Sequence, residues 1–334
     1  MKSSYKNPFA LERIVFYAKE MLQRGFDLKF YWYRLQWNIF PRLSLVPRFP
    51  IHMDIEVSDA CNLRCAMCVH GLEEMKNVGF IDKDFARKMI QEAALGGVSS
   101  IKFNWRGEPA LHKDLPDLVA FAKQMKIGEV QINTNGLPFT KEAIERLIDA
   151  GIDRVIFSVD ADTAETYAKI RIGGDFNKLV RNINYFIEYR NKKKSKKPFI
   201  RVQYVRMKEN EGEIKAFMER WHGRVDDIRV TDVTDRGQGK AAQVDDQIAV
   251  GRARCTQPWL RMVVSRDGLV MPCCSDWYCR WVIGDARKDS LKDIWRSEKM
   301  RQLRKLIFSR RLDEFEPCKS CFVKESYVWQ RVKK

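Results

Sequence analysis

The order of hydrophobic and polar residues predicts β-strands that alternate with helices from residue 51 to about residue 235. Six short runs rich in β-branched and aromatic residues predict strands. The segments between them carry apolar residues at helical spacing, as in "DKDFARKMIQEAAL", "LPDLVAFAKQMK" and "TKEAIERLIDAG". Such alternation indicates parallel βα units with right-handed crossovers. The strand runs are "IHMDIEV", "VSSIKFN", "GEVQINT", "IDRVIFSVD", "FIRVQYVR" and "VDDIRVTDV".

The residues before and after this region predict other elements. Residues 8–37 carry aromatic, aliphatic and basic residues at helical spacing. This pattern predicts one or two amphipathic helices that pack on the sheet or touch a membrane surface. After Val233, the polar, glycine-containing stretch "TDRGQGKAAQVDDQ" predicts a linker.

The C-terminal part predicts a small separate unit. Two β-like runs joined at Asp267 and Gly268 indicate a hairpin, and residues 290–308 predict a helix with Ser290 as its cap. The expected organisation is an N-terminal helical extension (1–48), an α/β body (49–235), a linker (236–252) and a cysteine-rich C-terminal domain (253–334).

Polar motifs follow several of the predicted strands. The segment "DACNLRCAMCVHG" (59–71) follows the first strand, and "RGEP" (106–109), "NTNG" (133–136) and "SVDAD" (158–162) follow later ones. In doubly wound sheets and in barrels, ligands bind beyond the carboxyl ends of parallel strands. The sequence therefore predicts a site where these motifs converge.

Composition limits the possible partners. The formal charge of +17 favours anionic partners, which include nucleic acid, acidic small molecules and acidic membrane surfaces. The run "RNKKKSKK" resembles a solvated helix end, and no RNA-recognition or zinc-finger signature is present, so we expect a small-molecule substrate and no nucleic acid. No apolar run approaches the roughly 20 residues of a membrane span. We expect a cytoplasmic protein without a transmembrane segment.

Nine cysteines fall into two groups separated by nearly 190 residues. Their odd number and clustered spacing favour metal ligation or catalysis over a disulfide framework. Thiolates select iron–sulfur clusters, zinc or Cu(I). The first group consists of Cys61, Cys65 and Cys68. A structural zinc site normally has four ligands, whereas an iron–sulfur cubane held by three thiolates keeps one iron open.

This cysteine pattern, in a loop after a strand and ahead of a βα region, resembles the radical S-adenosylmethionine (SAM) superfamily. The resemblance covers residues about 50–235 and implies a partial (βα)6 TIM-like barrel. It also implies that the open iron of a [4Fe–4S] cluster binds SAM, which an electron cleaves to methionine and a 5′-deoxyadenosyl radical. A reducing partner such as flavodoxin or ferredoxin would supply that electron.

The resemblance also assigns SAM-binding residues. "RGEP" is similar to a glycine–glycine–glutamate motif that receives the methionine amine, with Arg106 in the place of the first glycine. "NTNG" is similar to the rim of the third strand, near the ribose or methionine. "FSVDADTAETYAKIR" is similar to a segment whose serine and arginine hold the SAM carboxylate. The expected residues are Gly107, Glu108, Pro109, Asn133, Asn135, Ser158 and Arg171.

The second cysteine group resembles a twitch domain, a shortened SPASM module of α+β structure that holds one auxiliary [4Fe–4S] cluster. Its expected ligands are Cys255, Cys273, Cys318 and Cys321, and a structural four-cysteine zinc site is the alternative.

Two cysteines, Cys274 and Cys279, have no place in this ligand set. They could be packing residues, substitute ligands or donors of a hydrogen atom to a substrate radical.

By this resemblance we expect oxidation of an alcohol of a carbohydrate-like or aminocyclitol molecule to a ketone, with the auxiliary cluster as electron acceptor. The alternatives are an epimerase that uses Cys274 or Cys279, and a peptide- or protein-modifying maturase. A protein that uses its clusters only for electron transfer or binding is a further alternative.

Overall fold

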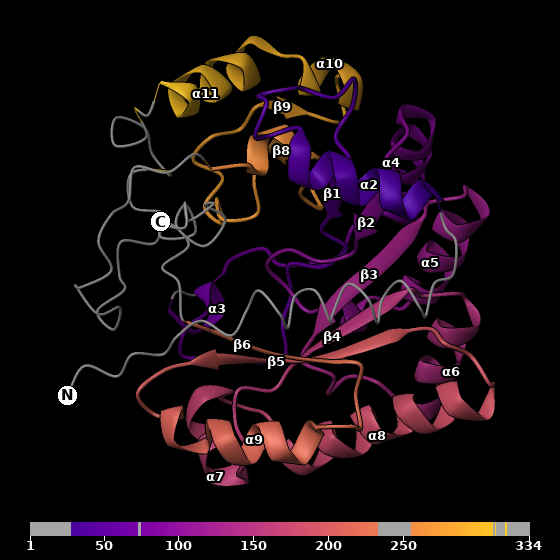
Figure 1. The fold of residues 1–334 in the computed structure, drawn as a ribbon, viewed down its shortest axis with the longest axis vertical. Helices are drawn as coiled ribbons and strands as arrows, with labels where there is room; N and C mark the ends of the chain where they lie inside the picture. Colours follow the sequence, from indigo (N-terminus) through magenta and orange to yellow (C-terminus); the bar gives the residue numbers. More distant parts are fainter. Residues whose placement is uncertain (1–27, 73–74, 233–254, 310, 312–317, 319–334) are drawn as a thin grey trace, which may run out of the picture.

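One nine-stranded sheet organises the molecule (Figure 1). The computed structural model describes residues 28–72, 75–232, 255–309, 311 and 318. The strand order is β6-β5-β4-β3-β2-β1-β7-β8-β9, parallel from β6 to β7 and antiparallel from β7 to β9. The strands are β1 (His52–Ile55), β2 (Ser100–Lys102), β3 (Glu129–Thr134), β4 (Arg154–Ser158), β5 (Phe199–Arg206), β6 (Asp227–Asp232), β7 (Arg261–Val264), β8 (Leu269–Met271) and β9 (Gly284–Asp285).

Each of the six predicted strand runs contains one strand, and helices cover the outer face of these strands (Figure 1). On β4, Val155 and Phe157 are fully buried, and the ring of Phe157 lies 5.2 Å from that of Phe186. The helices are α2 (Leu28–Ile39), α3 (Val69–Leu72), α4 (Lys83–Gly96), α5 (Leu115–Gln124), α6 (Lys141–Asp149), α7 (Ala164–Ile170), α8 (Phe176–Lys192), α9 (Ile214–Trp221), α10 (Leu291–Trp295) and α11 (Glu298–Phe308). Short 3-10 turns span Pro109–Leu111, Glu211–Glu213 and Gln257–Trp259. The α/β fold with a partial, TIM-like barrel is confirmed.

The opposite, inner face of the strands is polar. Asp54 on β1 lies 3.3 Å from both Lys102 on β2 and Arg261 on β7. On the neighbouring strands, Arg154 lies 3.0 Å from Glu129. These contacts cross from strand to strand because alternate residues of each strand point to the same side. The strands thus present charged and amide side chains where an ordinary barrel would be filled with branched apolar ones.

The predicted hairpin is present, but its first strand extends the barrel sheet. Val263 and Val264 of β7 pair with Met271 and Val270 of β8, with the turn at Asp267 and Gly268. Along its other edge β7 pairs in parallel with β1. The sheet thus continues from the α/β body into the expected C-terminal domain. This connection was not predicted, because a pairing across about 200 residues leaves no local pattern in the sequence.

The helix predicted over residues 290–308 is two helices, α10 and α11. Ser290 caps α10 by accepting the N–H of Asp293, as predicted. A second serine, Ser297, caps α11 by accepting the N–H of Met300. The chain therefore turns between the two caps, so that both Trp295 and Leu303 are buried in the core.

The helix α2 packs at the amino-terminal ends of β1, β2 and β7. Phe30 and Tyr33 are buried, and the ring of Trp37 lies 5.9 Å from His52, the first residue of β1. This confirms packing on the sheet for the described part of the predicted helices. Residues 8–27 and the expected linker, 236–252, lie outside the described residues. No helix in the described ranges is long and apolar enough to cross a membrane.

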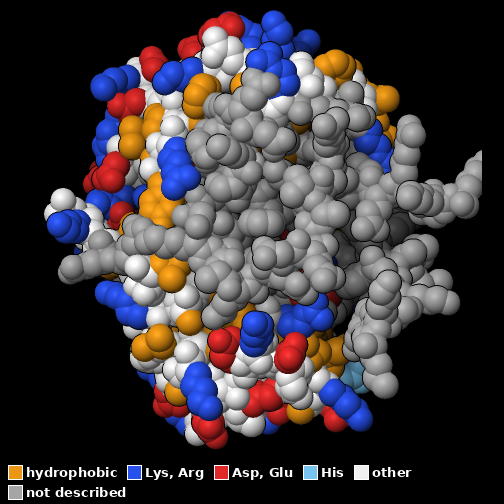
Figure 2. All heavy atoms as spheres, turned by 90° about the vertical axis from the view of Figure 1, so that its left-hand side faces the viewer, with side chains coloured by type: hydrophobic (Ala, Val, Ile, Leu, Met, Phe, Trp, Pro, Cys, Tyr) orange, Lys and Arg blue, Asp and Glu red, His pale blue; other side chains and the backbone are white. Residues whose placement is uncertain are grey.

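Basic and acidic side chains are mixed on the surface. Figure 2 shows both kinds interspersed over the described part of one face of the molecule. Some form exposed ion pairs, such as Arg301 with Glu298 at 2.7 Å and Lys193 with Asp149 at 2.9 Å. The formal charge of +17 is therefore not gathered into one basic stripe on the described part of this face.

Candidate functional site

The first three cysteines lie together in the loop between β1 and α3. Cys65 is buried, and Cys61 and Cys68 are half-buried. The N–H of Cys68 donates to the carbonyl of Cys65 at 3.0 Å, which closes a tight turn. Burial raises the pKa of the Cys61 thiol to about 12, and nearby Glu108, Cys65 and Cys68 add to this effect. The free thiol of Cys61 therefore keeps its proton at neutral pH, and binding of a metal there would release that proton.

The kind of donor bears on the metal centre. Cys61, Cys65 and Cys68 offer three sulfur ligands, and thiolates select iron–sulfur clusters, zinc or Cu(I). A cubane held by three thiolates keeps one iron open, so this donor set fits the iron–sulfur cluster that the sequence predicts.

The "RGEP" loop packs directly against this cysteine loop. A Cβ on Gly107 would lie 2.3 Å from the carbonyl oxygen of Ser58 and 2.6 Å from that of Ala60, so only glycine fits. The next residue, Glu108, donates its N–H to the same Ala60 carbonyl at 2.9 Å. Pro109 then begins a 3-10 turn and is buried. The loop is thus fixed beside the cysteines by its backbone.

The carboxylate of Glu108 holds the end of β3. It accepts the hydroxyl of Thr134 at 2.5 Å, the N–H of Asn135 at 2.7 Å and the N–H of Ala110 at 3.0 Å. Burial nevertheless raises the pKa of Glu108. The side chain of Asn135 continues this chain of contacts, because its amide donates to Asn62 of the cysteine loop at 2.9 Å. Glu108 and Asn135 therefore act here as positioning residues that tie β3 to the cysteines.

Two asparagines on neighbouring strands carry unpartnered oxygens. Asn133 lies on β3 and Asn104 follows β2. Their Oδ1 atoms are buried and have no hydrogen-bond partner among the described residues. Because a buried acceptor without a partner costs free energy, these oxygens are suited to donors of a bound molecule. Ser158 ends β4, half-buried, at the same edge of the sheet.

Arg171 reaches the cysteine loop from the end of α7. Its Nη1 lies 3.3 Å from the sulfur of Cys65, and its Nη2 donates to the carboxylate of Asp160. Burial alone would lower the pKa of Arg171, but the charges of Asp160 and Cys65 raise it. The hydroxyl of Tyr167 is buried nearby without a partner among the described residues. The guanidinium of Arg171 therefore places a permanent positive charge beside the sulfur of Cys65.

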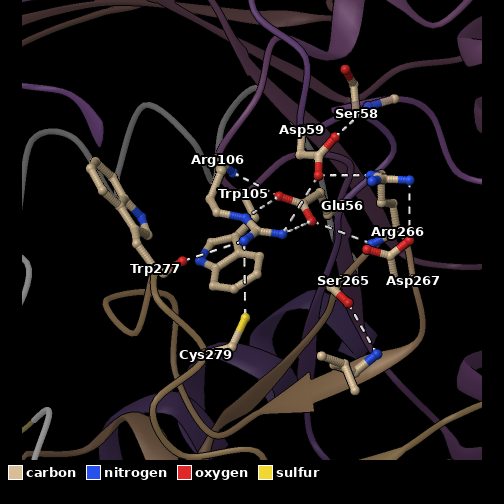
Figure 3. Close-up of polar contacts among 12 residues, drawn as sticks. Glu56, Ser58, Asp59, Trp105, Arg106, Ser265, Arg266, Asp267, Trp277 and Cys279 are labelled. Carbon is tan, nitrogen blue, oxygen red and sulfur yellow. Dashed lines mark hydrogen bonds and ion pairs between the residues drawn. The ribbon is translucent and has the colours of Figure 1, made fainter. Parts of the chain in front are cut away.

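Arg106 joins the "RGEP" loop to the C-terminal part of the chain (Figure 3). Its guanidinium donates to both oxygens of buried Glu56, at 2.9 and 2.8 Å. Its Nη1 contacts the carbonyl of Trp277 at 3.4 Å and the sulfur of Cys279 at 3.9 Å. Beside it, the indole N–H of Trp105 donates to the carbonyl of Cys274 at 2.9 Å. Arg106, which stands where the similar motif has a glycine, thus makes side-chain contacts that a glycine could not make.

Cys274 and Cys279 lie in the same small apolar cluster as Cys68, with Trp105 and Trp277 at its centre. Burial raises the pKa of Cys279 to about 11, so this thiol keeps its proton at neutral pH. The structure therefore places both cysteines beside the loop of the first three.

The other C-terminal cysteines are described in part. Cys255, Cys273 and Cys318 are half-buried, and Cys255 and Cys318 pack against the main core. Cys321 lies outside the described residues. The assignment of these four as ligands of one centre remains a prediction.

Several residues of this site had no role in the sequence-based expectations. Asp160 has a backbone φ of +60°, unusual for a residue with a side chain, and it holds Arg171. Asp59 binds Arg266 at 2.7 Å, next to the pair of Glu56 and Arg106 (Figure 3). Their one signal in the sequence was their position among polar residues at strand ends.

Two family models match the chain. The model described as "Radical SAM superfamily" matches residues 55–220, which include the three-cysteine loop and Arg171. The model described as "Iron-sulfur cluster-binding domain", SPASM, matches residues 255–322, which include the four C-terminal candidate ligands.

The chain is also similar to individual proteins. A probable GTP 3′,8-cyclase of Methanococcus maripaludis is 32% identical over 134 residues; the match covers 40% of this chain and 44% of that protein, less than half its length. The structure of BtrN in complex with AdoMet and 2-DOIA has a TM-score of 0.56 at 18% identity, over 82% of this chain and 93% of that one. Streptococcus suis SuiB bound to precursor peptide SuiA has a TM-score of 0.64 at 15% identity, over 84% and 71%. The two structural matches show likeness of fold alone.

Proposed function

Because the chain belongs to the radical SAM superfamily and carries a C-terminal SPASM domain, we propose that it oxidises an alcohol of a small carbohydrate-like molecule to a ketone. These domains imply a SAM-binding [4Fe–4S] cluster and auxiliary iron–sulfur binding. When bound, the reduced cluster and SAM would supply the radical chemistry that removes a hydrogen atom from the C–H bond, and an auxiliary cluster would supply an acceptor for the remaining electron; a base would take the hydroxyl proton.

In this proposal, the residues at the carboxyl ends of the strands have separate tasks. Cys61, Cys65 and Cys68 hold the SAM-binding cluster, and the backbone beside Gly107 and Pro109 receives the methionine part of SAM. Glu108 and Asn135 fix the two loops relative to each other. The ligands of one auxiliary cluster are Cys255, Cys273, Cys318 and Cys321.

The single observation that carries the choice of substrate is the buried amide oxygen of Asn104, which has no partner among the described residues and no assigned role in SAM binding. Asn104 follows β2, at the edge of a sheet whose inner face carries charged and amide groups. An acceptor in this position favours a molecule with several hydroxyl or amino donors over an apolar side chain. A polyol, an aminocyclitol or a nucleotide-linked sugar has such donors.

Two of the similar proteins support a small polar substrate. BtrN binds 2-DOIA in the structure that this chain resembles, and this chain covers 93% of BtrN. The sequence relative from Methanococcus maripaludis is a probable cyclase of GTP, another small polar molecule. A cyclised product and a ketone differ in oxidation state. Analysis of the product therefore separates a cyclase from an alcohol-oxidising enzyme.

Peptide modification is a second candidate. The SuiB structure has the higher TM-score, 0.64, and SuiB is bound there to a precursor peptide. Epimerisation is a third, favoured by the thiol of Cys279, which burial keeps protonated and which could donate a hydrogen atom.

The test is anaerobic incubation of the reconstituted enzyme with SAM and dithionite in deuterated water. The panel contains aminocyclitols, nucleotide sugars, GTP and peptides, and mass spectrometry measures each product together with 5′-deoxyadenosine. We expect a product two hydrogens lighter than its substrate, formed in step with 5′-deoxyadenosine. The matched variants Cys274→Ala and Cys279→Ala should leave this oxidation in place.

Other outcomes would replace the proposal. Incorporation of one deuterium at carbon, lost in Cys279→Ala, would establish the epimerase. A modified peptide, with every small molecule unchanged, would establish the maturase.

A further inference from the structure

The helix α2 is apolar on two opposite faces. Phe30, Tyr33 and Trp37, spaced at i, i+3 and i+7, form the face that packs on the sheet. Trp37 contacts both His52 and Arg261, the first residues of β1 and β7. The helix is therefore anchored at the amino-terminal ends of the strands, opposite the edge that carries the cysteine loop.

The other face of α2 is apolar and exposed. Leu28, Trp32 and Leu35, spaced at i, i+4 and i+7, are 73%, 55% and 45% exposed. An ordinary surface helix has charged or polar residues on the face turned away from the core. This face of α2 instead presents the kind of side chains that a helix buries against a partner.

The chain that follows α2 carries further exposed apolar side chains. Leu43, Leu45 and Val46 are also exposed, and we call these six residues, 28 to 46, the α2 surface. Thirteen large apolar side chains are exposed in the described part of the chain, and six of them belong to the α2 surface. Single exposed apolar residues are normal, but a concentration of this kind marks an interaction site.

The charged residues in this stretch of the chain are all basic. Residues 28–50 contain Lys29, Arg34, Arg42 and Arg48 and no aspartate or glutamate. Of these, Lys29, Arg42 and Arg48 are exposed. A partner that covers the α2 surface must therefore accept apolar side chains and carry negative charge around them.

We propose that the α2 surface binds the anionic surface of a phospholipid membrane. Trp and Leu side chains enter the boundary between headgroups and acyl chains, and flanking lysines and arginines contact the phosphates. A convex helix needs no complementary groove to dock in this way. Because α2 lies at the opposite end of the strands from the cysteine loop, the bound enzyme keeps its site open to the solution.

Two other occupants fit less well. A second copy in a symmetric dimer would bring the same cations face to face, which is repulsive. Residues 1–27 of the chain itself carry more lysines and arginines than acidic residues, so they add positive charge.

The test measures co-sedimentation of the full-length, reconstituted protein with phosphatidylcholine vesicles, with and without about a quarter of phosphatidylglycerol. We expect binding to the anionic vesicles that weakens at high salt. The double variant Trp32→Gln/Leu35→Gln should lose about tenfold or more of this binding. Leu95→Gln is the matched control, because Leu95 is 79% exposed but lies on α4.

The readouts separate the possible failures. The SAM-cleavage activity and melting temperature of the double variant should equal those of the control, so loss of binding cannot come from misfolding. Failure of the wild-type protein to bind anionic vesicles, or equal binding by the double variant, overturns the proposal. A dimer that the double variant dissociates, without vesicle binding, assigns the α2 surface to a second copy. A lower melting temperature in the double variant, without vesicle binding, assigns the α2 surface to residues 1–27. Binding to an acidic protein, without vesicle binding, assigns the α2 surface to an acidic protein partner.

Discussion

The guanidinium of Arg171 lies 3.3 Å from the sulfur of Cys65, held in place by buried Asp160. Asp160 is itself fixed, because its second oxygen accepts the N–H of Val205 at 2.7 Å. Hydrogen bonds to ligand sulfurs are one of the means by which proteins set the reduction potential of an iron–sulfur cluster. Arg171 is expected to bind the SAM carboxylate, and it also contacts a sulfur that would ligate the cluster. It could therefore influence the reduction potential of that cluster.

Arg171→Gln should lower the reduction potential of the SAM-binding cluster. The positive charge of Arg171 beside Cys65 stabilises the more negative, reduced state of the cluster, so its loss should shift the reduction equilibrium by about tenfold, or about 59 mV for one electron. A redox titration followed by electron paramagnetic resonance, without SAM, measures this shift. Arg146→Gln, an exposed pair with Asp117, is the control. An unchanged midpoint in Arg171→Gln would refute the role.

Gly107→Ala should weaken SAM binding. The new methyl group would overlap the carbonyls of Ser58 and Ala60, so the loop must move and the bond from Glu108 to Ala60 must break. We expect a loss of about 2–4 kcal/mol in unfolding free energy and SAM affinity at least about tenfold weaker. Denaturant unfolding and equilibrium dialysis test these values. Gly212→Ala, where nothing lies within 4 Å of the added carbon, should match the wild type.

Arg106→Gln should destabilise the protein strongly. Glu56 is fully buried, and without the guanidinium its carboxylate loses its two charge-assisted hydrogen bonds. Breaking a buried pair in this way costs about 3–5 kcal/mol. Arg301→Gln removes an exposed pair with Glu298 and should cost less than about 1 kcal/mol. Equal unfolding midpoints for the two variants would contradict the structural role of Arg106.

Cys279 should react slowly with iodoacetamide at neutral pH. Burial raises its thiol pKa to about 11, so at pH 8 only about one molecule in a thousand carries the thiolate. Because the thiolate is the reactive form, the rate should rise about tenfold per pH unit up to about pH 11. Peptide mass spectrometry of samples quenched at several pH values measures the rate. A rate at pH 8 as fast as that of an unfolded control would show that the thiol is not buried as described.

The architecture was accessible from the sequence because its signals are local. All six barrel strands were predicted, since each is a short run of β-branched and aromatic residues between helical segments. The caps of α4 and α10 follow the same local rules, with Asp82 accepting the N–H of Phe85 and Ser290 that of Asp293. The place of β7 beside β1 was not predicted, because parallel pairing of distant segments depends on the whole sheet.

The sequence predicted that the cysteine loop and the motifs at the strand ends lie together, but not the contacts that join them; the roles of these residues remain predictions. Asp160 and Asn62 lie inside motifs that the sequence analysis singled out. Their partners, Arg171 and Asn135, could not be predicted, because these contacts form only when the chain folds. In the sequence, Arg106 is only a departure from a glycine motif. In the structure, its contacts with Glu56 and Cys279 join the "RGEP" loop to the C-terminal part of the chain, and these contacts form only where three segments of the chain meet.

The metal content and SAM chemistry of anaerobically purified protein test the SAM-binding cluster at Cys61, Cys65 and Cys68. We expect iron and acid-labile sulfide in equal amounts, and conversion of SAM to 5′-deoxyadenosine on reduction. Replacing these three cysteines with alanine should abolish that conversion while leaving the iron of the C-terminal cysteines. Zinc in place of iron and sulfide, or unchanged 5′-deoxyadenosine formation in the triple variant, would contradict the assignment of the cluster.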